Sequence, residues 1–427
     1  MRVRCSLFVA GVLLGLGCPA DPDPGPQGLQ PGEPLGLELP RRSISADEVG
    51  VIVNTDDPLS ALIAETYLLA RQIPAKNRIE LALGTAPNLD RVSFAAHQAV
   101  IDAAFGDRIQ AIALTSMTPQ TVDCMAVSAA VALGFDERWC QPGPPCNTTD
   151  LADTYDSDTT APFTDLGIRP TMILAAATLQ DAQDLIARGV AADGTLPTGR
   201  GFAVRTTDSA RSTRWEELLG AVQTWGEVLD LTYVDNSGGG GSDLIEDEDD
   251  LLFYFTGLTE VAGIASNTWR PGAVADHLTS LGGQVPTSSQ MSVLAWLQAG
   301  ATASYGTAIE PCNYPSKFPD PEVLIPHYLG GNTVVEAYWK SVWMPGEGNF
   351  VGEPLARPWG GAQTRYESGL WTITTTNLVP DQRYALEVAA TPDGPWEHVE
   401  RIEFETLDLQ VIEVLDPAAG WYRFIED

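Results

Sequence analysis

The 427-residue sequence predicts an α/β domain, with a mostly parallel sheet covered by helices on both faces, followed by a small all-β sandwich. First, short apolar runs alternate with helical segments from residue 51 to residue 342, which is the pattern of repeated βα units. Second, residues 362–427 contain alternating strands and turns without helical periodicity. Third, the run 110–115 is almost free of polar residues inside, as expected for a strand buried on both faces. We therefore expect an α/β domain at 43–361 and a β-sandwich at 362–427.

The individual elements follow from periodicity and from helix start and stop signals. Strands of the α/β domain are expected at 51–54, 78–83, 110–115, 171–176, 202–205, 231–234, 251–255 and 301–305. Its helices are expected at 59–71, 94–105, 179–190, 215–225, 290–297 and 333–342. Residues 118–167 show little regular pattern, and we expect this long insertion to be a functional loop. Strands of the β-sandwich are expected at 371–376, 384–388, 399–404 and 409–414.

Residues 1–18 have the features of an export signal. Two arginines precede an apolar run that is too short for a good membrane span. The segment ends in Gly17-Cys18, which resembles the bacterial lipobox, in which the cysteine is lipidated; ordinary signal cleavage beside an incidental cysteine is the alternative. Residues 19–42 are rich in Pro, Gly and Asp, and we expect an extended tether. The prediction is an exported lipoprotein of the bacterial cell envelope, anchored to a membrane through Cys18.

The chain is strongly acidic, with 24 Lys or Arg residues, 57 Asp or Glu residues, a formal net charge of −33 and an isoelectric point near 4.2. Phosphate binding needs clustered Lys and Arg, so nucleic acid is excluded as a default partner. Expected partners are the membrane, through the anchor, and a surface protein or polysaccharide. The sequence has no Gly-x-Gly-x-x-Gly after its first strand, no Walker A motif and no Gly-x-Ser-x-Gly elbow. Nucleotide binding and ordinary α/β-hydrolase chemistry are therefore unsupported.

Four cysteines remain outside the signal: Cys124, Cys140, Cys146 and Cys312. An even number in an exported chain favours disulfides, and three pairings are possible. The turn-rich loop between Cys140 and Cys146 could close on itself, which would leave Cys124 with Cys312. A zinc site is the competing interpretation, but the spacing is not Cys-x₂-Cys and the chain has four histidines.

Three stretches of the α/β domain carry a resemblance to known sequences. They are Asn54-Thr-Asp-Asp-Pro-Leu-Ser60 with the following 71–77, then Ala301-Thr-Ala-Ser-Tyr-Gly-Thr-Ala-Ile-Glu-Pro311, and Val351-Gly-Glu-Pro-Leu-Ala-Arg-Pro358. Together they resemble a family of uncharacterised exported bacterial proteins, notably from myxobacteria. The resemblance spans roughly residues 48–360 and brings no catalytic assignment.

A more distant similarity concerns Tyr254-Phe-Thr-Gly-Leu258, residues 299–306 and Gly352-Glu-Pro354. Their order is similar to that in gingipain-like cysteine peptidases, which implies a caspase-like fold with a catalytic His in a Thr-Gly-His-Gly segment and a Cys after the next strand. Here Leu258 stands at the histidine position, and residues 274–283 contain no cysteine. Leucine cannot accept a proton, so the resemblance implies a scaffold without the Cys–His dyad.

Relocated catalytic groups are the alternative to a lost activity. Asp276, His277 and Ser280 lie close to the position of the missing nucleophile and suggest a Ser–His–Asp set. Adjacent Asp and His side chains rarely point at one another, so a loop or helix-start histidine beside an N-capping aspartate is the favoured interpretation. Cys312 is a second possible nucleophile, and a structural disulfide is the favoured role for it.

Several aspartates are candidates for a ligand or metal. Asp56 and Asp57 follow the first strand, and Asp208 follows the strand at 202–205, so all three are expected at the carboxyl edge of the sheet, where open α/β sheets bind ligands. Helix capping explains Asp56 or Asp57 equally well. A separate run has aspartate spacing that suits calcium, but it lacks the central Gly and the final Glu of an EF-hand. The candidate calcium ligands in this run are Asp153, Asp156 and Asp158.

These observations predict a cell-envelope lipoprotein that acts by binding or scaffolding, without catalysis, and with calcium as its one possible cofactor. The alternative is an active exported hydrolase or peptidase whose nucleophile and base have moved to Ser280 with His277, or to Cys312. A nucleophile within about 3.2 Å of a base would favour the enzyme.

Overall fold

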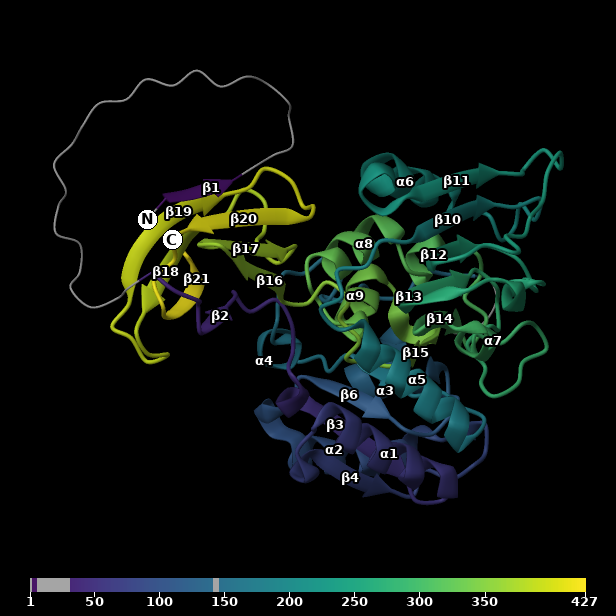
Figure 1. Ribbon diagram of the computed structural model, residues 1–427. Coiled ribbons are helices and arrows are strands. Elements are labelled where there is room, and N and C mark those ends of the chain that lie inside the picture. The colour runs from purple at the N-terminus through teal and green to yellow at the C-terminus, as the bar shows by residue number, and fades with distance from the viewer. Residues whose placement is uncertain (1, 6–30, 141–145) are drawn as a thin grey trace, which may run out of the picture. The chain divides into compact units, whose positions relative to one another are not determined.

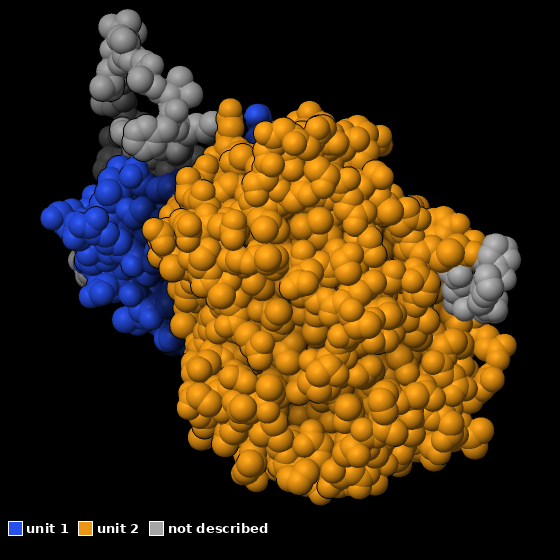
Figure 2. Space-filling model, turned by 90° about the vertical axis from the view of Figure 1, so that its right-hand side faces the viewer, with its two compact units in different colours: residues 1–41, 359–427 blue, residues 42–358 orange. Residues whose placement is uncertain are grey.

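The computed structural model describes residues 2–5, 31–140 and 146–427 (Figure 1). The chain divides into two compact units, which Figure 2 distinguishes by colour. The α/β unit is Arg42–Pro358, and the β unit comprises residues 359–427 with the described residues before 42. Cys18 and residues 19–30 of the expected tether lie outside the described residues. Later in that expected tether, the strand β2 (Gly36–Glu38) pairs with the last strand of the β unit, so the segment 19–42 is not a tether throughout.

A ten-stranded sheet forms the centre of the α/β unit. In spatial order its strands are β11 (Leu231–Asp235), β10 (Arg200–Arg205), β12 (Leu251–Thr256), β13 (Trp269–His277), β14 (Ala303–Thr307), β15 (Gly348–Gly352), β9 (Thr171–Ile173), β6 (Ala111–Leu114), β3 (Val49–Asn54) and β4 (Arg78–Leu81). The strands β11 to β14 pair in parallel, as do β9 to β4, and β15 is antiparallel to β14. The predicted mixed α/β fold with a mostly parallel sheet is confirmed.

Helices lie between the strands in sequence (Figure 1). They are α1 (Pro58–Arg71), α2 (Arg91–Phe105), α3 (Val127–Leu133), α4 (Pro162–Leu166), α5 (Leu179–Ala192), α6 (Trp215–Leu229), α7 (Leu294–Ala299), α8 (Pro321–Leu329) and α9 (Val334–Ser341). Every residue of β3, β6, β12 and β15 is buried, so both faces of the sheet are covered. The carboxylates of Asp57, Asp90 and Asp320 cap α1, α2 and α8, as short acidic side chains commonly do at helix starts.

The loop that follows β6 and the loop that follows β13 meet at the edge of the sheet where β15 begins. Asn349, at the start of β15, donates its side-chain amide to the carbonyl oxygen of Gln120 after β6 (3.0 Å) and to that of Gly283 after β13 (3.1 Å). One side chain therefore joins the loops of the two parallel halves of the sheet. We call this edge the carboxyl edge.

The structure contains elements that the sequence pattern does not predict. The strand β13 begins Trp269-Arg-Pro-Gly, and Pro and Gly obscure a strand pattern because they weaken its hydrogen-bonded ladder. β15 is short and has glycine at both ends, and α8 contains Pro326, a residue that usually ends a helix. The insertion 118–167 is more regular than expected, with α3, α4 and two short strands, β7 (Thr121–Val122) and β8 (Met125–Ala126), which form a small sheet with β5 (Asn88–Leu89).

The β unit is all-β, as the sequence predicts. One sheet contains β1 (Arg2–Cys5), β20 (Gln410–Leu415), β17 (Leu370–Thr375) and β16 (Ala362–Glu367); the other contains β19 (Glu397–Glu403), β18 (Arg383–Ala389), β21 (Trp421–Glu426) and β2. Alternating residues of the two sheets share one apolar cluster, as in a sandwich. The largest members of this cluster are Trp371, Tyr384, Tyr422 and Phe424. β1 lies inside the segment expected to be a signal peptide.

Candidate functional site

A cavity of about 300 Å³ opens at the carboxyl edge, beside the ends of β10, β13 and β14. We call it the edge cavity. Its polar lining consists of Arg211, Thr279, Ser280, Glu310 and Asn313, and the Cys146–Cys312 disulfide forms part of its wall. Ser280 and Cys312 were both candidates from the sequence, so the structure does bring them to one cavity.

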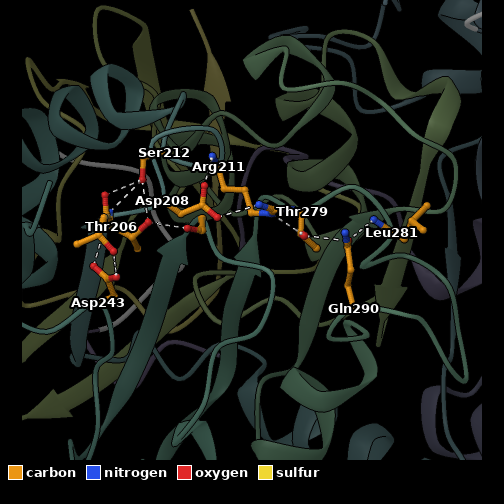
Figure 3. Close-up of polar contacts among 10 residues, drawn as sticks. Thr206, Asp208, Arg211, Ser212, Asp243, Thr279, Leu281 and Gln290 are labelled. Carbon is orange, nitrogen blue, oxygen red and sulfur yellow. Dashed lines mark hydrogen bonds and ion pairs between the residues drawn. The ribbon is translucent and has the colours of Figure 1, made fainter. Parts of the chain in front are cut away.

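A chain of polar contacts holds the loops around this cavity (Figure 3). The guanidinium of Arg211 donates from Nη1 to Asp208 (2.8 Å) and from Nε to the Thr279 hydroxyl (3.1 Å). That hydroxyl donates in turn to Oε1 of Gln290 (2.8 Å), which also accepts the backbone N–H of Leu281 (2.8 Å). The loop after β10 is thus tied to the loop after β13.

The same loop after β10 is tied to the loop after β12. The hydroxyl of Thr206 donates to the carbonyl oxygen of Gly257 (2.7 Å) and lies 2.9 Å from the Ser212 hydroxyl. A Cβ at position 257 would lie 1.9 Å from the carbonyl oxygen of Arg211, so this close approach requires glycine. Glycine therefore lets the backbone before Leu258 lie against the backbone of Arg211, a residue that lines the cavity.

His277 is fully buried, and both of its ring nitrogens are engaged. Nδ1 accepts from the indole N–H of Trp296 (2.9 Å), and Nε2 lies 3.2 Å from the carbonyl oxygen of Met291. Since an indole nitrogen only donates, Nδ1 must be the unprotonated nitrogen and Nε2 must carry the hydrogen. Burial lowers the pKa of His277 to about 4. The ring is a neutral core group with no free lone pair for a nucleophile.

Asp276 is paired with a different residue. Its Oδ1 accepts from Nη2 of Arg214 (2.6 Å), and both side chains are 1% exposed. Burial raises the pKa of Asp276, and the charge of Arg214 opposes that effect. Asp276 and His277 are the last residues of β13 rather than loop or helix-start residues, so the N-capping interpretation is wrong. Adjacent residues of a strand point to opposite faces, which explains why these two side chains do not meet.

The two nucleophile candidates lack a base. The carbonyl oxygen of Ser280 accepts from the Thr307 hydroxyl (2.9 Å), but no hydrogen bond joins the Ser280 hydroxyl to a basic group in the described part of the chain. Cys312 is bonded to Cys146, and Cys124 to Cys140. The predicted disulfides are confirmed, while the suggested closure of Cys140 on Cys146 is wrong. Disulfides indicate an oxidising compartment.

The aspartate candidates do not converge. Six strands separate β3 from β10 in the sheet, so Asp56 and Asp57 lie roughly 30 Å from Asp208 at the usual strand spacing. Asp57 caps α1, and Asp56 accepts the backbone N–H of Gly84 (2.8 Å).

The calcium candidates lie on the insertion between β6 and β9. Asp153, Asp156 and Asp158 are exposed, and Oδ1 of Asp156 lies 3.0 Å from Nε2 of His327. Within residues 2–5, 31–140 and 146–427, no group of three His, Cys, Asp or Glu side chains is placed to hold a metal ion.

Sequence reasoning missed three residues that organise this region: Arg211, Gln290 and Trp296. Arg211 follows Asp208 by three residues, a spacing that permits an ion pair across one turn, and this was an available signal. Nothing local to Gln290 or Trp296 marks them, because their partners belong to other segments of the chain.

Two solved protease structures are similar to this chain. An Arg-specific cysteine proteinase, gingipain R, aligns with a TM-score of 0.43 and 8% identity over 90% of this chain and 99% of that one. A second protease aligns with a TM-score of 0.42 and 9% identity over 90% of this chain and 98% of that one. No family model and no curated protein matches the sequence. These TM-scores are too low to establish a shared fold family, and kinship with exported myxobacterial proteins stays a prediction.

Across the described ranges, no helix combines the length and the apolar character needed to cross a bilayer.

Proposed function

We propose that the chain is a cell-envelope lipoprotein whose α/β unit binds a ligand at the edge cavity without cleaving it. The observation that carries this proposal is that each candidate catalytic group beside the cavity has a structural partner or lacks a base. His277 bonds to Trp296, Cys312 bonds to Cys146, and Ser280 has no basic partner in the described residues. A hydroxyl without a base is a weak nucleophile at neutral pH.

Binding, by contrast, needs only an open cavity and hydrogen-bonding groups that have no partner in the protein. The Arg211 side chain is 25% exposed. Its Nε and Nη1 are engaged, whereas Nη2 has no partner in the described residues. Guanidinium N–H groups form their strongest hydrogen bonds with carboxylate and phosphate oxygens, and they also donate to carbonyl oxygens. The ligand we infer therefore presents a carboxylate or a carbonyl, as a surface protein or an acidic polysaccharide does.

The same proposal includes the fold of the α/β unit and the location of the protein. The sequence resemblance of Tyr254-Phe-Thr-Gly-Leu258 to gingipain-like peptidases supports a caspase-like α/β unit in which Leu258 replaces the catalytic histidine. The Gly17-Cys18 segment supports lipid anchoring at a membrane of the cell envelope, and the two disulfides agree with export.

The test uses the full chain, exported so that its disulfides form, and a diverse peptide library. Cleavage is measured by mass spectrometry, and retention on the immobilised protein is measured for the same peptides. We expect no cleavage, and we expect retained peptides that Arg211→Ala releases. The matched control is Arg200→Ala, since Arg200 begins β10 and so lies at its other end.

The rival function is an active peptidase or other hydrolase. Cleavage that Ser280→Ala abolishes would overturn the binding proposal and identify a nucleophile whose base is recruited on substrate binding. Retention that responds equally to Arg211→Ala and Arg200→Ala would remove the edge cavity from the proposal.

A further inference from the structure

A second cavity, of about 330 Å³, lies among the helices of the α/β unit. The insertion 118–167 contributes Tyr155, α6 contributes Glu217, the residue that caps α8 contributes Asp320, and Trp343 follows α9. Phe318 completes the apolar part of the lining. We call this site the acidic aromatic cavity.

One wall of the acidic aromatic cavity is a pair of stacked rings. The rings of Tyr155 and Trp343 have centroids 5.0 Å apart and planes 13° apart. The Tyr155 hydroxyl donates to Oδ2 of Asp320 (3.0 Å), which fixes the orientation of its ring. Trp343 is 42% exposed, and it is the one aromatic residue among the exposed large apolar side chains in the described residues. A large aromatic surface is thus kept rigid and open to solvent.

The rest of the lining carries unbalanced negative charge. Oε2 of Glu217 is buried without a hydrogen-bond partner in the described residues. Burial raises the pKa of Glu217 and the charge of Asp320 raises it further, while a backbone hydrogen bond and the charge of Arg214 oppose this shift. Arg214 also lines this cavity, and its one positive charge acts on Asp276, Glu217 and Asp320 alike. Three carboxylates therefore share one guanidinium, which leaves negative charge in excess around the cavity.

Rigid aromatic surface beside carboxylates that outnumber the nearby cations is the combination that binds organic cations, because the ring face and the carboxylates both attract positive charge in a partly desolvated space. A guest that carried no charge would leave Glu217 unmatched. We propose that the acidic aromatic cavity binds an organic ammonium group, which lies against the Trp343 indole and is balanced by Glu217 and Asp320. Phe318 lines both this cavity and the edge cavity, but the ammonium site uses none of the polar groups of the edge cavity and does not depend on the function proposed there.

The test measures binding of choline to the full disulfide-bonded chain by saturation-transfer NMR. The uncharged isostere 3,3-dimethyl-1-butanol is the matched ligand control. A second arm uses Nα-acetyl-lysine methylamide, which distinguishes a quaternary head group from the primary ammonium of a lysine side chain. We expect at least one ammonium probe to bind and the neutral isostere to bind about tenfold more weakly or worse.

Two variants assign the site. Glu217→Gln and Trp343→Ala should each weaken binding of the ammonium probe by about three- to tenfold. Glu216→Gln removes the same charge from a neighbouring exposed position of α6 and should leave binding unchanged. Circular dichroism checks that each variant is folded, and Trp343→Phe should retain part of the affinity if Trp343→Ala does not fold. The proposal is overturned if neither ammonium probe binds, if the neutral isostere binds equally well, or if Glu217→Gln and Glu216→Gln have the same effect.

Discussion

The edge cavity and the acidic aromatic cavity are similar in volume and share Phe318 in their linings, but their polar groups are organised differently. Around the edge cavity, Asp208, Arg211, Thr279 and Gln290 form a continuous chain of contacts, in which Nη2 of Arg211 is left without a partner in the described residues. In the acidic aromatic cavity, Oε2 of the half-buried Glu217 has no hydrogen-bond partner in the described residues. The difference shows that a polar side chain does not become reactive merely because it lies at the edge of a sheet. Groups that are matched by each other hold loops in place, and groups that are left unmatched are available to a ligand.

The largest expected effect is on the free energy of unfolding, and it comes from replacing Arg214. Arg214 lines the acidic aromatic cavity and neutralises Asp276 at the end of β13. Arg214→Met should lower the free energy of unfolding by about 3 to 5 kcal/mol, because it leaves a carboxylate buried without its counter-charge. Urea unfolding followed by tryptophan fluorescence measures the change.

The matched control for that prediction is Arg270→Met. Arg270 lies on the same strand, but its ion pair with Asp250 is exposed on both sides (44% and 53%). Loss of this ion pair should lower the free energy of unfolding by less than about 1 kcal/mol. Equal losses for the two variants would contradict the role assigned to the buried pair.

A second prediction concerns the pH dependence of stability. Burial lowers the pKa of His277 from 6.5 to about 4, so the unfolded chain binds this proton more tightly than the folded chain does. Stability therefore falls as the pH drops below about 6.5, by up to about 1.4 kcal/mol per pH unit, and the effect saturates near pH 4. Urea unfolding at several pH values should show a shallower acid slope in His277→Gln than in the wild type.

His327 also has its pKa lowered to about 4, chiefly by burial, so the wild type keeps an acid slope from that group. The difference between wild type and His277→Gln isolates His277. The exposed His398→Gln serves as the control, and the same reduction of slope in both variants would show that the buried Trp296–His277–Met291 arrangement is not its cause.

A third prediction tests whether the polar chain of the edge cavity holds structure. Gln290→Ala removes the acceptor shared by the Thr279 hydroxyl and the Leu281 N–H, and it should cost about 1 to 3 kcal/mol of stability. Gln298→Ala, at an exposed position of α7, should change stability by less than about 0.5 kcal/mol. Thermal unfolding provides the measurement. No loss in Gln290→Ala would mean that the loop after β13 is held by other contacts.

The smallest predicted effect has the opposite sign. Without a ligand, Glu217→Gln should stabilise the chain by about 0.5 kcal/mol, because the variant removes a charge that folding partly buries and that Arg214 compensates only in part. Glu216→Gln should leave the midpoint of thermal unfolding unchanged. A destabilised Glu217→Gln variant would show that Glu217 stabilises the folded chain and would remove the contrast between the two cavities.

Much of the fold could be predicted because its signals are local. In β6, in the amphipathic helix α5 and in the alternating strands of the β unit, the spacing of the apolar residues shows which faces are buried. β13 was not predicted because Pro and Gly interrupt its first half. Asp276 and His277, which end this strand, were therefore expected in a loop or at a helix start. A wrong element therefore led directly to a wrong interpretation of the candidate site.

The sequence by itself determined the α/β class, the all-β C-terminal region, the acidity of the chain and the presence of paired cysteines. Only the tertiary structure decided which cysteines pair, that His277 bonds to Trp296 and Asp276 to Arg214, and that Tyr155, Glu217 and Trp343 line one cavity. The physical reason is the range of the interactions. Periodicity and composition reflect the burial of neighbouring residues, whereas the chemistry of a site depends on partners that folding brings together from distant parts of the chain.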